Sequence, residues 1–337
     1  MRNAGSGSDD GRTRRDHYAE VTAQITAALE AGTPPWRQPW DSGKAGGPMM
    51  PQNASTGAHY RGVNTLILGM SPVALASGDP RWATYRQAAE RGWQVRKGSR
   101  GTTGFFYKRI EIGDRDSDGD DVGRKFVPVL RAFTLFHASQ IDGIPPYVAP
   151  DPGEAPWRTP EAAATIARNS GAVIRTGGDQ AFYSPRTDQI QLPAANAFRS
   201  AAAFASVQLH EQAHRSGRAT KLNRDLSGRF GSADYAREEI VAELAQVFLC
   251  ATLGIEDCDW TNGASYISNR LTILRSDRKE IFRAASDAQR IADYLLAFHP
   301  DFARPTRDDE HAQPQAGSDE AHAEPSYIAS ASLQEAA

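Results

Sequence analysis

The sequence predicts an α+β fold with a mixed N-terminal domain and a mainly helical C-terminal domain. Residues 104–113 and 126–137 are rich in aromatic and branched side chains and flank a Gly/Asp-rich segment, which predicts a β-hairpin. After residue 158, helical periodicity dominates. The 337 residues are about twice the ~150 of a typical domain, so two domains with tails are expected.

The first predicted element is an amphipathic helix over residues 16–31, because apolar side chains recur at helical spacing from Tyr18 onward. The segment 34–51 that follows is so rich in Pro and Gly that a loop is expected. This loop nevertheless contains Trp36 and Trp40. Large aromatic side chains in a loop need a surface or a ligand to cover them.

A proline-rich segment separates the two predicted domains. Residues 144–157 contain five prolines, a composition typical of an extended linker. We therefore expect an N-terminal domain over residues 15–143 and a C-terminal domain over residues 158–302. The flanking segments, 1–14 and 303–337, are polar and are predicted to be disordered.

The C-terminal domain is predicted to be built from helices with two short strands. Gly171, Gly217 and Gly254 are placed as helix stop signals. The helices are expected over residues 159–170, 200–215, 233–253, 266–274 and 279–298, and the strands over residues 172–176 and 189–192.

Composition limits the class of protein. With 40% hydrophobic and 23% charged residues, the chain has an ordinary globular composition. It lacks a run of ~18 apolar residues and an apolar signal-peptide core, so we expect a cytoplasmic protein that does not enter a membrane. Cys250 and Cys258 are too few for a disulfide framework and are expected to be reduced. The net charge is −3, but residues 1–150 carry +4, residues 151–300 carry −1 and residues 301–337 carry −6.

The segment QLHEQAHRS contains the motif H-E-x-x-H as His210, Glu211 and His214 within a helical stretch. Four residues advance a helix by about 400°, so both imidazoles lie on one face and can fill two of the tetrahedral positions of zinc. Glu211 can then act as general base toward a water in an open position. Chance alone gives roughly 0.01 such matches in a chain of this composition. We therefore predict a site for one Zn²⁺ per chain.

The third ligand is expected from the next helix, where Glu238, Glu239 and Glu243 interrupt an apolar run. Glu239 lies 25 residues after His214, far enough for a loop to return the chain. The spacing of Glu239 and Glu243 resembles the second motif, E-x-x-x-D/E, of the gluzincin metallopeptidases. Glu239 is therefore the expected ligand, and Glu243 is expected to orient a ligating histidine. A charged stripe on a solvated helix face is the alternative interpretation.

A second acidic motif, Asp114 to Asp120, matches the opening of a calcium loop, D-x-D-x-D-G. Its twelfth position is Lys125 rather than a bidentate Glu, and predicted strands rather than helices flank it. A solvated hairpin loop, kept open by repulsion between its Asp side chains, is therefore predicted instead.

The N-terminal domain holds a basic and aromatic cluster between Arg81 and Arg109. Eight Lys and Arg residues occur there with a single acid, Glu90, and six aromatic residues lie among them. Positive charge follows a phosphate backbone while aromatic rings stack on exposed bases, so the combination favours single-stranded nucleic acid. The alternative is that the aromatic residues form core and the charges cover a solvated face.

Several N-terminal segments taken together resemble the ArdC-type antirestriction proteins. The resemblance covers roughly residues 15–300, with both domains in the expected order. It implies a single-stranded-DNA-binding domain joined to a zincin-like metallopeptidase domain, carried on mobile elements to protect incoming DNA from restriction. The segments are Pro35-Trp36 to Trp40, Asn53-Ala-Ser-Thr-Gly57, Tyr60-Arg-Gly-Val-Asn64, Trp82-Ala-Thr-Tyr-Arg-Gln87 and Gly92 to Gly101.

These observations define the expected sites. His210, His214 and Glu239 would bind zinc, and Glu211 would serve hydrolysis of a protein met on DNA, such as a DNA-bound host protein. Two alternatives stay open: a metalloprotease for which DNA binding is only recruitment, and a single-strand-binding module whose metal is structural and whose hydrolytic activity is silent. The candidate DNA-binding residues are Trp36, Trp40, Tyr60, Arg61, Asn64, Trp82, Tyr85, Arg86, Arg96, Lys97, Arg100 and Lys108.

Overall fold

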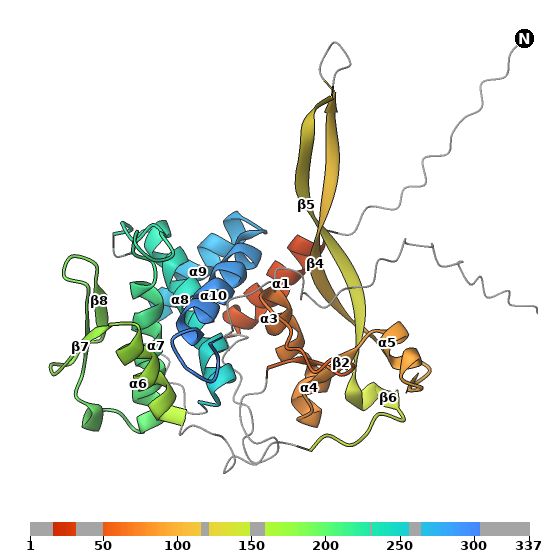
Figure 1. The fold of residues 1–337 in the computed structure, drawn as a ribbon, viewed down its shortest axis with the longest axis horizontal. Coiled ribbons are helices and arrows are strands. Elements are labelled where there is room, and N and C mark those ends of the chain that lie inside the picture. Colours follow the sequence, from red (N-terminus) through yellow and green to blue (C-terminus); the bar gives the residue numbers. More distant parts are fainter. Residues whose placement is uncertain are drawn as a thin grey trace, which may run out of the picture. The chain divides into compact units, whose positions relative to one another are not determined.

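The computed structural model describes residues 16–31, 50–115, 121–148, 159–229, 231–255 and 264–303 (Figure 1). These residues form both helices and sheets, so the predicted α+β fold class is confirmed. The predictions that lie outside the described residues concern the tails over 1–14 and 304–337, Trp36 and Trp40, linker residues 149–157, hairpin residues 116–120, and Cys258.

The elements are named in chain order. The helices are α1 (His17–Glu30), α3 (Val63–Gly69), α4 (Pro72–Ser77), α5 (Tyr85–Glu90), α6 (Thr159–Asn169), α7 (Ala201–Arg215), α8 (Ala233–Leu253), α9 (Ala264–Ser276) and α10 (Glu280–Leu296), with short 3-10 helices η2 (Ala138–Gln140) and η4 (Ala195–Ala197). The strands are β1 (Gln52–Asn53), β2 (Arg81–Ala83), β3 (Gln94–Val95), β4 (Thr102–Arg115), β5 (Asp121–His137), β6 (Ile141–Asp142), β7 (Val173–Thr176), β8 (Phe182–Ser184) and β9 (Gln189–Leu192).

The N-terminal part is organised around the predicted hairpin. Strands β4 and β5 pair in antiparallel register from Thr102↔Leu135 onward and form a long twisted ribbon (Figure 1). Both strands are longer than predicted, because the charged residues toward the tip also adopt strand pairing. The base of the ribbon belongs to a four-stranded sheet of order β1-β2-β5-β4, in which β1 and β2 are parallel. A separate antiparallel pair joins β3, which precedes the hairpin in the chain, to β6, which follows it.

The C-terminal part is mainly helical, as predicted. The predicted helices agree with α6 to α10 to within two residues at each end, and the predicted strands correspond to β7 and β9. Strand β8 was not predicted, because its three residues are too short for a periodic pattern. It pairs antiparallel with β9, which is parallel to β7 on its other side, so β8 is an edge of the three-stranded sheet.

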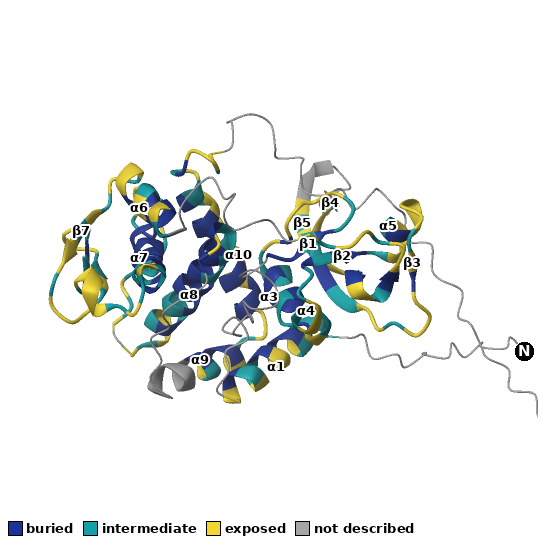
Figure 2. Cartoon of the chain, turned by 90° about the horizontal axis from the view of Figure 1, so that it is seen from below, coloured by how far each residue is buried: buried dark blue, intermediate teal, exposed yellow. Residues whose placement is uncertain are grey.

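Helix α8 lies at the centre of the largest hydrophobic core cluster. Its side chains Ile240, Leu244 and Phe248 have no exposed surface, and Figure 2 shows the buried faces of this helix and its neighbours in dark blue. Ile25 and Leu29 of α1 belong to the same cluster. Helix α1, which precedes the predicted linker, therefore shares a core with helices that follow it. None of the described helices is both long and apolar enough to span a membrane.

Candidate metal centre

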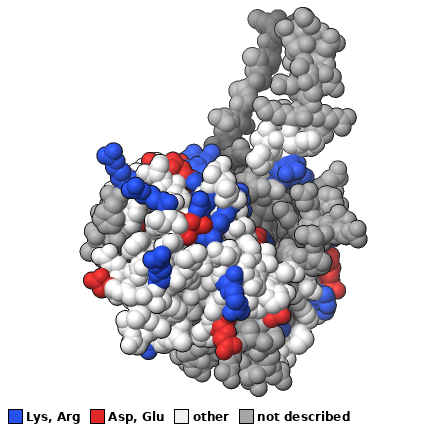
Figure 3. Space-filling model, turned by 60° about the vertical axis from the view of Figure 1, so that its left-hand side comes forward, with Lys and Arg blue, Asp and Glu red and all other residues white. Residues whose placement is uncertain are grey.

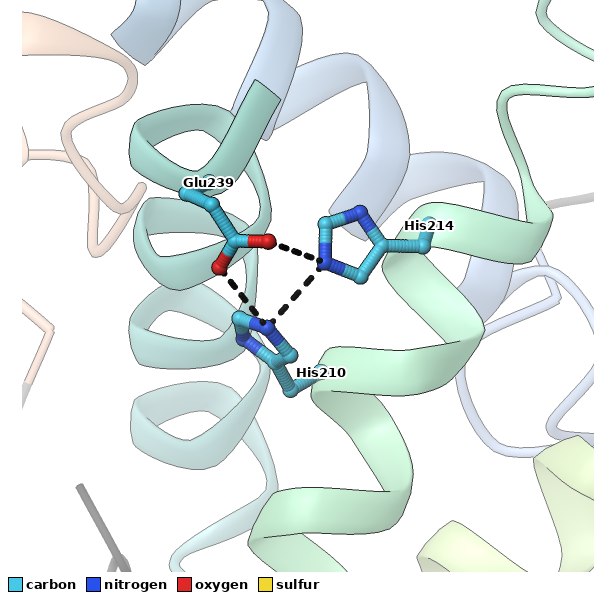
Figure 4. A group of neighbouring side chains, drawn as sticks. All are labelled: His210, His214 and Glu239. Carbon is cyan, nitrogen blue, oxygen red and sulfur yellow. Dashed lines mark hydrogen bonds and ion pairs between the residues drawn. The ribbon is translucent and has the colours of Figure 1, made fainter. Parts of the chain in front are cut away.

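Helix α7 places two imidazoles one turn apart. Its first turns are rich in alanine, the residue with the highest helix propensity. The hydroxyl of Ser200 caps the helix by accepting a hydrogen bond from the N–H of Ala203 at 3.0 Å. His210 and His214 extend from one face of α7 toward α8 (Figure 4). Their Nε2 atoms lie 3.2 Å apart.

Helix α8 brings a carboxylate to the two imidazoles. Glu239 Oε2 lies 3.6 Å from His210 Nε2, and Glu239 Oε1 lies 3.4 Å from His214 Nε2. The three side chains are only 13–16% exposed. In the part of the chain that the structure describes, they form a group whose ligand atoms all lie within 4.8 Å of one another. The structure thus brings together the three residues that the sequence predicts as ligands.

The separations between these atoms fit a tetrahedral metal ion. Zinc bonds to nitrogen and oxygen are about 2.0–2.2 Å long, which places neighbouring ligand atoms of a tetrahedron about 3.3–3.6 Å apart. The observed distances of 3.2, 3.4 and 3.6 Å lie at or close to this range. Two imidazoles and one carboxylate leave a fourth coordination position for water or substrate. The residues present therefore fit a divalent metal.

Glu238, the neighbour of Glu239, orients His214. The Nδ1 atom of His214 lies 3.3 Å from Glu238 Oε1, which directs Nε2 of the same ring toward Glu239. Arg224 holds Glu238 in a bidentate pair, since Nη2 donates to Oε1 at 2.7 Å and Nε donates to Oε2 at 3.2 Å. Arg224 Nη2 also donates to the carbonyl of Ala213 at 2.7 Å. Arg224 therefore fixes Glu238 to the end of α7.

The loop that carries Arg224 returns close to α7, and this return requires Gly217. A Cβ atom at Gly217 would lie 2.8 Å from Leu226 Cδ2 and 3.1 Å from Arg224 Nη2. A larger residue would therefore displace Arg224 and, with it, Glu238. Sequence reasoning placed Gly217 only as a helix stop and missed Arg224, because no periodic pattern marks a loop residue.

Burial and charge act in opposite directions on the side chains of the centre. Burial favours a neutral imidazole, but Glu238 and Glu239 outweigh it and raise the pKa of His214 well above its ordinary value. Burial likewise opposes ionisation of Glu239, but contacts with His210 and His214 hold the pKa of Glu239 below its usual range. These contacts favour the ionised form of the carboxylate, which is the form that binds a divalent cation.

Glu211 lies on the same helix between the two histidines. Its side chain is 6% exposed, and burial raises its pKa, although the charges of His210 and His214 act in the opposite direction. The backbone N–H of Tyr183 on β8 donates a hydrogen bond to the Glu211 carboxylate. The edge strand β8 therefore holds the predicted general base in place.

The role predicted for Glu243 requires a correction. Glu243 forms a buried ion pair with Arg270 of α9, whereas the carboxylate that contacts the far nitrogen of a predicted ligand belongs to Glu238. The physical reason is the position of α9, which supplies a cation to Glu243, while the loop after α7 brings Arg224 to Glu238. We therefore transfer the orienting role from Glu243 to Glu238.

Two candidate DNA-binding aromatics lie in the core. Trp82 has no exposed surface and Tyr60 is 8% exposed, and both pack in one small cluster with Leu68 and Leu135. Neither ring has an exposed face on which a base could stack. The prediction that Tyr60 and Trp82 bind DNA is therefore wrong. For Trp82 the alternative interpretation, that the aromatic residues between Arg81 and Arg109 form core, is correct.

The other described candidates keep polar or exposed side chains. Tyr85 is 57% exposed, and Lys97, Arg100 and Lys108 are also exposed. Several candidates already have partners within the chain: Asn64 bonds the backbone of Phe105, and Arg61, Arg86 and Arg96 pair with Asp293, Glu90 and Asp142.

Basic side chains do not gather on every face of the molecule. On the face that Figure 3 draws, Lys and Arg are spread among uncharged and acidic side chains. Among the residues that the structure describes on that face, the basic side chains form no continuous positive track of the kind that a phosphate backbone follows.

Comparison with known proteins identifies the two halves of the chain. A family model described as the N-terminal domain of anti-restriction factor ArdC matches residues 15–136, and one described as a zincin-like metallopeptidase matches residues 161–287. The crystal structure of the antirestriction ArdC protein from plasmid R388, in metal-free form, superposes with a TM-score of 0.69 at 36% identity, covering 86% of this chain and 100% of that one. The chain belongs to the ArdC family of antirestriction proteins. Its C-terminal part is a zincin-like domain.

Other proteins similar to this chain differ in length. The chain is 41% identical over 298 residues to the uncharacterized protein y4eC of Sinorhizobium fredii, covering 87% of this chain and 95% of that protein. It is 40% identical over 301 residues to a DNA primase TraC of Escherichia coli, covering 85% of this chain but only 27% of the primase. The chain thus spans about a quarter of that primase.

A second structure of the R388 ArdC protein is a Mn(II)-bound form, with a TM-score of 0.68, 36% identity, and coverage of 84% of this chain and 98% of that one.

The geometry predicts unequal roles for the two adjacent carboxylates. Glu239→Gln should weaken zinc binding more than Glu238→Gln, because the first removes a charged ligand and the second only loosens His214. Loss of such an orienting partner typically costs about 10- to 100-fold in metal affinity. Competition with a chromogenic zinc chelator measures both variants, and a larger loss for Glu238→Gln would move the ligand to Glu238.

Proposed function

We propose that this ArdC-family chain binds single-stranded DNA through its N-terminal part and carries a zinc metallopeptidase site in its zincin-like part. The observation that carries the second half is the meeting of His210, His214 and Glu239 across α7 and α8, with ligand atoms 3.2–3.6 Å apart. Glu211 on the same helix supplies the general base. The proposed role is protection of incoming DNA of a mobile element.

Zinc is the metal that this set of donors favours. Two imidazole nitrogens and one carboxylate with an open position are typical of catalytic zinc. When bound, zinc would act as a Lewis acid that polarises a carbonyl oxygen. It would also lower the pKa of a coordinated water to about 7. We expect one ion per chain.

In this proposal Glu211 moves the proton. Its carboxylate accepts a proton from the water that attacks a peptide carbonyl, and it later donates that proton to the leaving amine. A general base works best when its pKa approaches the working pH, and burial raises the pKa of Glu211 in that direction. The hydrogen bond from the N–H of Tyr183 fixes the carboxylate. The proposed substrate is a protein met on DNA.

Single-strand binding is supported by exposed cations and an exposed aromatic ring in the N-terminal part. Lys97 and Arg100 lie in the turn between β3 and β4, and Lys108 extends from β4. Tyr85 at the start of α5 adds an exposed ring. Cations along a surface bind phosphates without sequence preference, and exposed rings add stacking that a duplex cannot offer.

The first test of this proposal is DNA binding. Single-stranded DNA should bind more tightly than a duplex of the same length, and its affinity should fall steeply as salt is raised, because bound phosphates release counterions. Fluorescence anisotropy at several salt concentrations measures both. Equal affinity for the two forms, or binding that does not depend on salt, would contradict the proposal.

The second test separates hydrolysis from a structural metal. Glu211→Gln should keep the fold, the zinc and single-strand binding while removing cleavage of a protein bound with DNA, since only the proton acceptor is lost. Gel analysis of DNA-binding proteins incubated with the chain and single-stranded DNA measures cleavage. Unchanged cleavage by Glu211→Gln would exclude Glu211 as the base. If the wild-type protein contains zinc but cleaves none of the tested proteins, the metal is structural, as in the alternative interpretation.

A further inference from the structure

A cavity of about 420 Å³ opens in the N-terminal part, away from the metal centre. Pockets of ~300–1,000 Å³ are the usual size for small-molecule ligands. This one lies between the start of β2, the 3-10 helix η2 and the segment that follows β6. Its walls include Ser77, Asp79, Arg81, Ser139, Pro145 and Tyr147.

One buried imidazole, that of His137, contacts three of these wall residues, Ser77, Asp79 and Ser139. His137 has no exposed surface. Its Nε2 atom donates to the carbonyl of Asp79 at 2.7 Å and lies 3.3 Å from the hydroxyl of Ser77. Its Nδ1 atom accepts from the N–H of Ser139 at 3.1 Å and lies 2.8 Å from the Ser139 hydroxyl. The polar side of the cavity is therefore built before any ligand arrives.

Arg81 and Tyr147 form a second, layered wall. The guanidinium of Arg81 is fixed by Asp79, with Nη2 donating to Oδ2 at 2.8 Å, and it also donates to the carbonyl of Pro145 at 2.8 Å. It lies over the Tyr147 ring, 5.3 Å from the ring centroid. Aromatic rings and guanidinium planes are the two surfaces on which proteins stack unpaired bases.

Exposed cations lie beside the cavity. Arg96 contacts the carbonyl of Ser139, a wall residue. Gln140, the next residue along η2, donates through its side-chain amide to the carbonyl of Arg100 at 3.0 Å. The turn that carries Arg96, Lys97 and Arg100 is thus fastened to η2. A flat stacking wall, hydroxyl groups and adjacent cations are what a base with its flanking phosphates requires.

We propose that this cavity receives one unpaired base of single-stranded DNA, stacked on the Arg81–Tyr147 pair, with its flanking phosphates on Lys97 and Arg100. The inference rests on the proposed single-strand binding and assigns it a base subsite. The hydroxyls of Ser77 and Ser139 meet the edge of the base. A base stacked and paired in a duplex has no free face for this pair, so the subsite favours single strands over duplex DNA.

The test compares Tyr147→Ala and Tyr147→Phe for binding of a thymidine dodecamer and of a backbone of the same length without bases. Tyr147→Ala should weaken the dodecamer about tenfold, and Tyr147→Phe should bind within about twofold of wild type, because it keeps the ring. Neither substitution should change binding of the abasic backbone. Phe182→Ala, which removes an exposed ring on β8, serves as the matched control and should bind both as wild type does.

A second measurement does not depend on a variant that folds. Saturation-transfer NMR on the wild-type chain should show contact of the thymine methyl of thymidine 5′-monophosphate, and excess deoxyribose 5-phosphate should not remove the signal. Wild-type affinity for the dodecamer in Tyr147→Ala, or an equal loss on the abasic backbone, would overturn the base subsite while leaving single-strand binding intact. Failure of the wild-type chain to bind the dodecamer would instead overturn the proposed function itself.

Discussion

The packing of α7 against α8 is the constraint on which the candidate metal centre depends. The two helices run antiparallel, so that Ser206 meets Gln246 at one end and the histidines meet Glu238 and Glu239 at the other. The amide of Gln246 donates to the hydroxyl of Ser206 at 2.6 Å and to its carbonyl at 3.1 Å. This buried contact fixes the register between the helices. A shift of α8 by one residue would carry Glu239 away from the imidazoles.

The carboxylates of α8 near the metal centre are buried, so their positions depend on the cations that pair with them. A buried ion pair that loses one partner leaves an uncompensated charge, which typically costs about 3–5 kcal/mol. Glu238 is matched by His214 and Arg224, and Glu243 is matched by Arg270. Glu238 and Glu243 of α8 therefore each have a cation supplied by another segment. The loop after α7 and the helix α9 therefore stabilise the metal centre, although neither provides a predicted metal ligand.

How much of the metal centre could be predicted from the sequence depends on how far apart along the chain the interacting residues lie. His210, Glu211 and His214 lie within one helical turn, and the helix period alone places both imidazoles on one face. Glu239 was predicted with the help of a family resemblance, because its distance from His214 along the chain is set by a loop. The prediction that Glu243 orients a ligating histidine was wrong, since the partner of each carboxylate depends on where Arg224 and Arg270 lie in space.

The N-terminal part shows the same limit. The hairpin over β4 and β5 could be predicted from its composition, but composition cannot tell which aromatic residues face inward. Trp82 has no exposed surface because its ring packs on the face of β2 that meets Tyr60, Leu68 and Leu135, whereas Tyr85, three residues later, is exposed at the start of α5. Strand β8 and the wall residue Tyr147 carry no periodic signal, and only the folded chain brings them to Glu211 and to the base-sized cavity.

Metal content of the purified chain tests the metal centre most directly. Wild-type protein should carry one zinc per chain by elemental analysis, and His210→Ala and His214→Ala should each lose it, because each removes one ligand of a three-residue site. His59→Ala, which removes an exposed histidine of the N-terminal part, should retain it. Stoichiometric zinc in both His210→Ala and His214→Ala would contradict the assignment of the centre to α7 and α8.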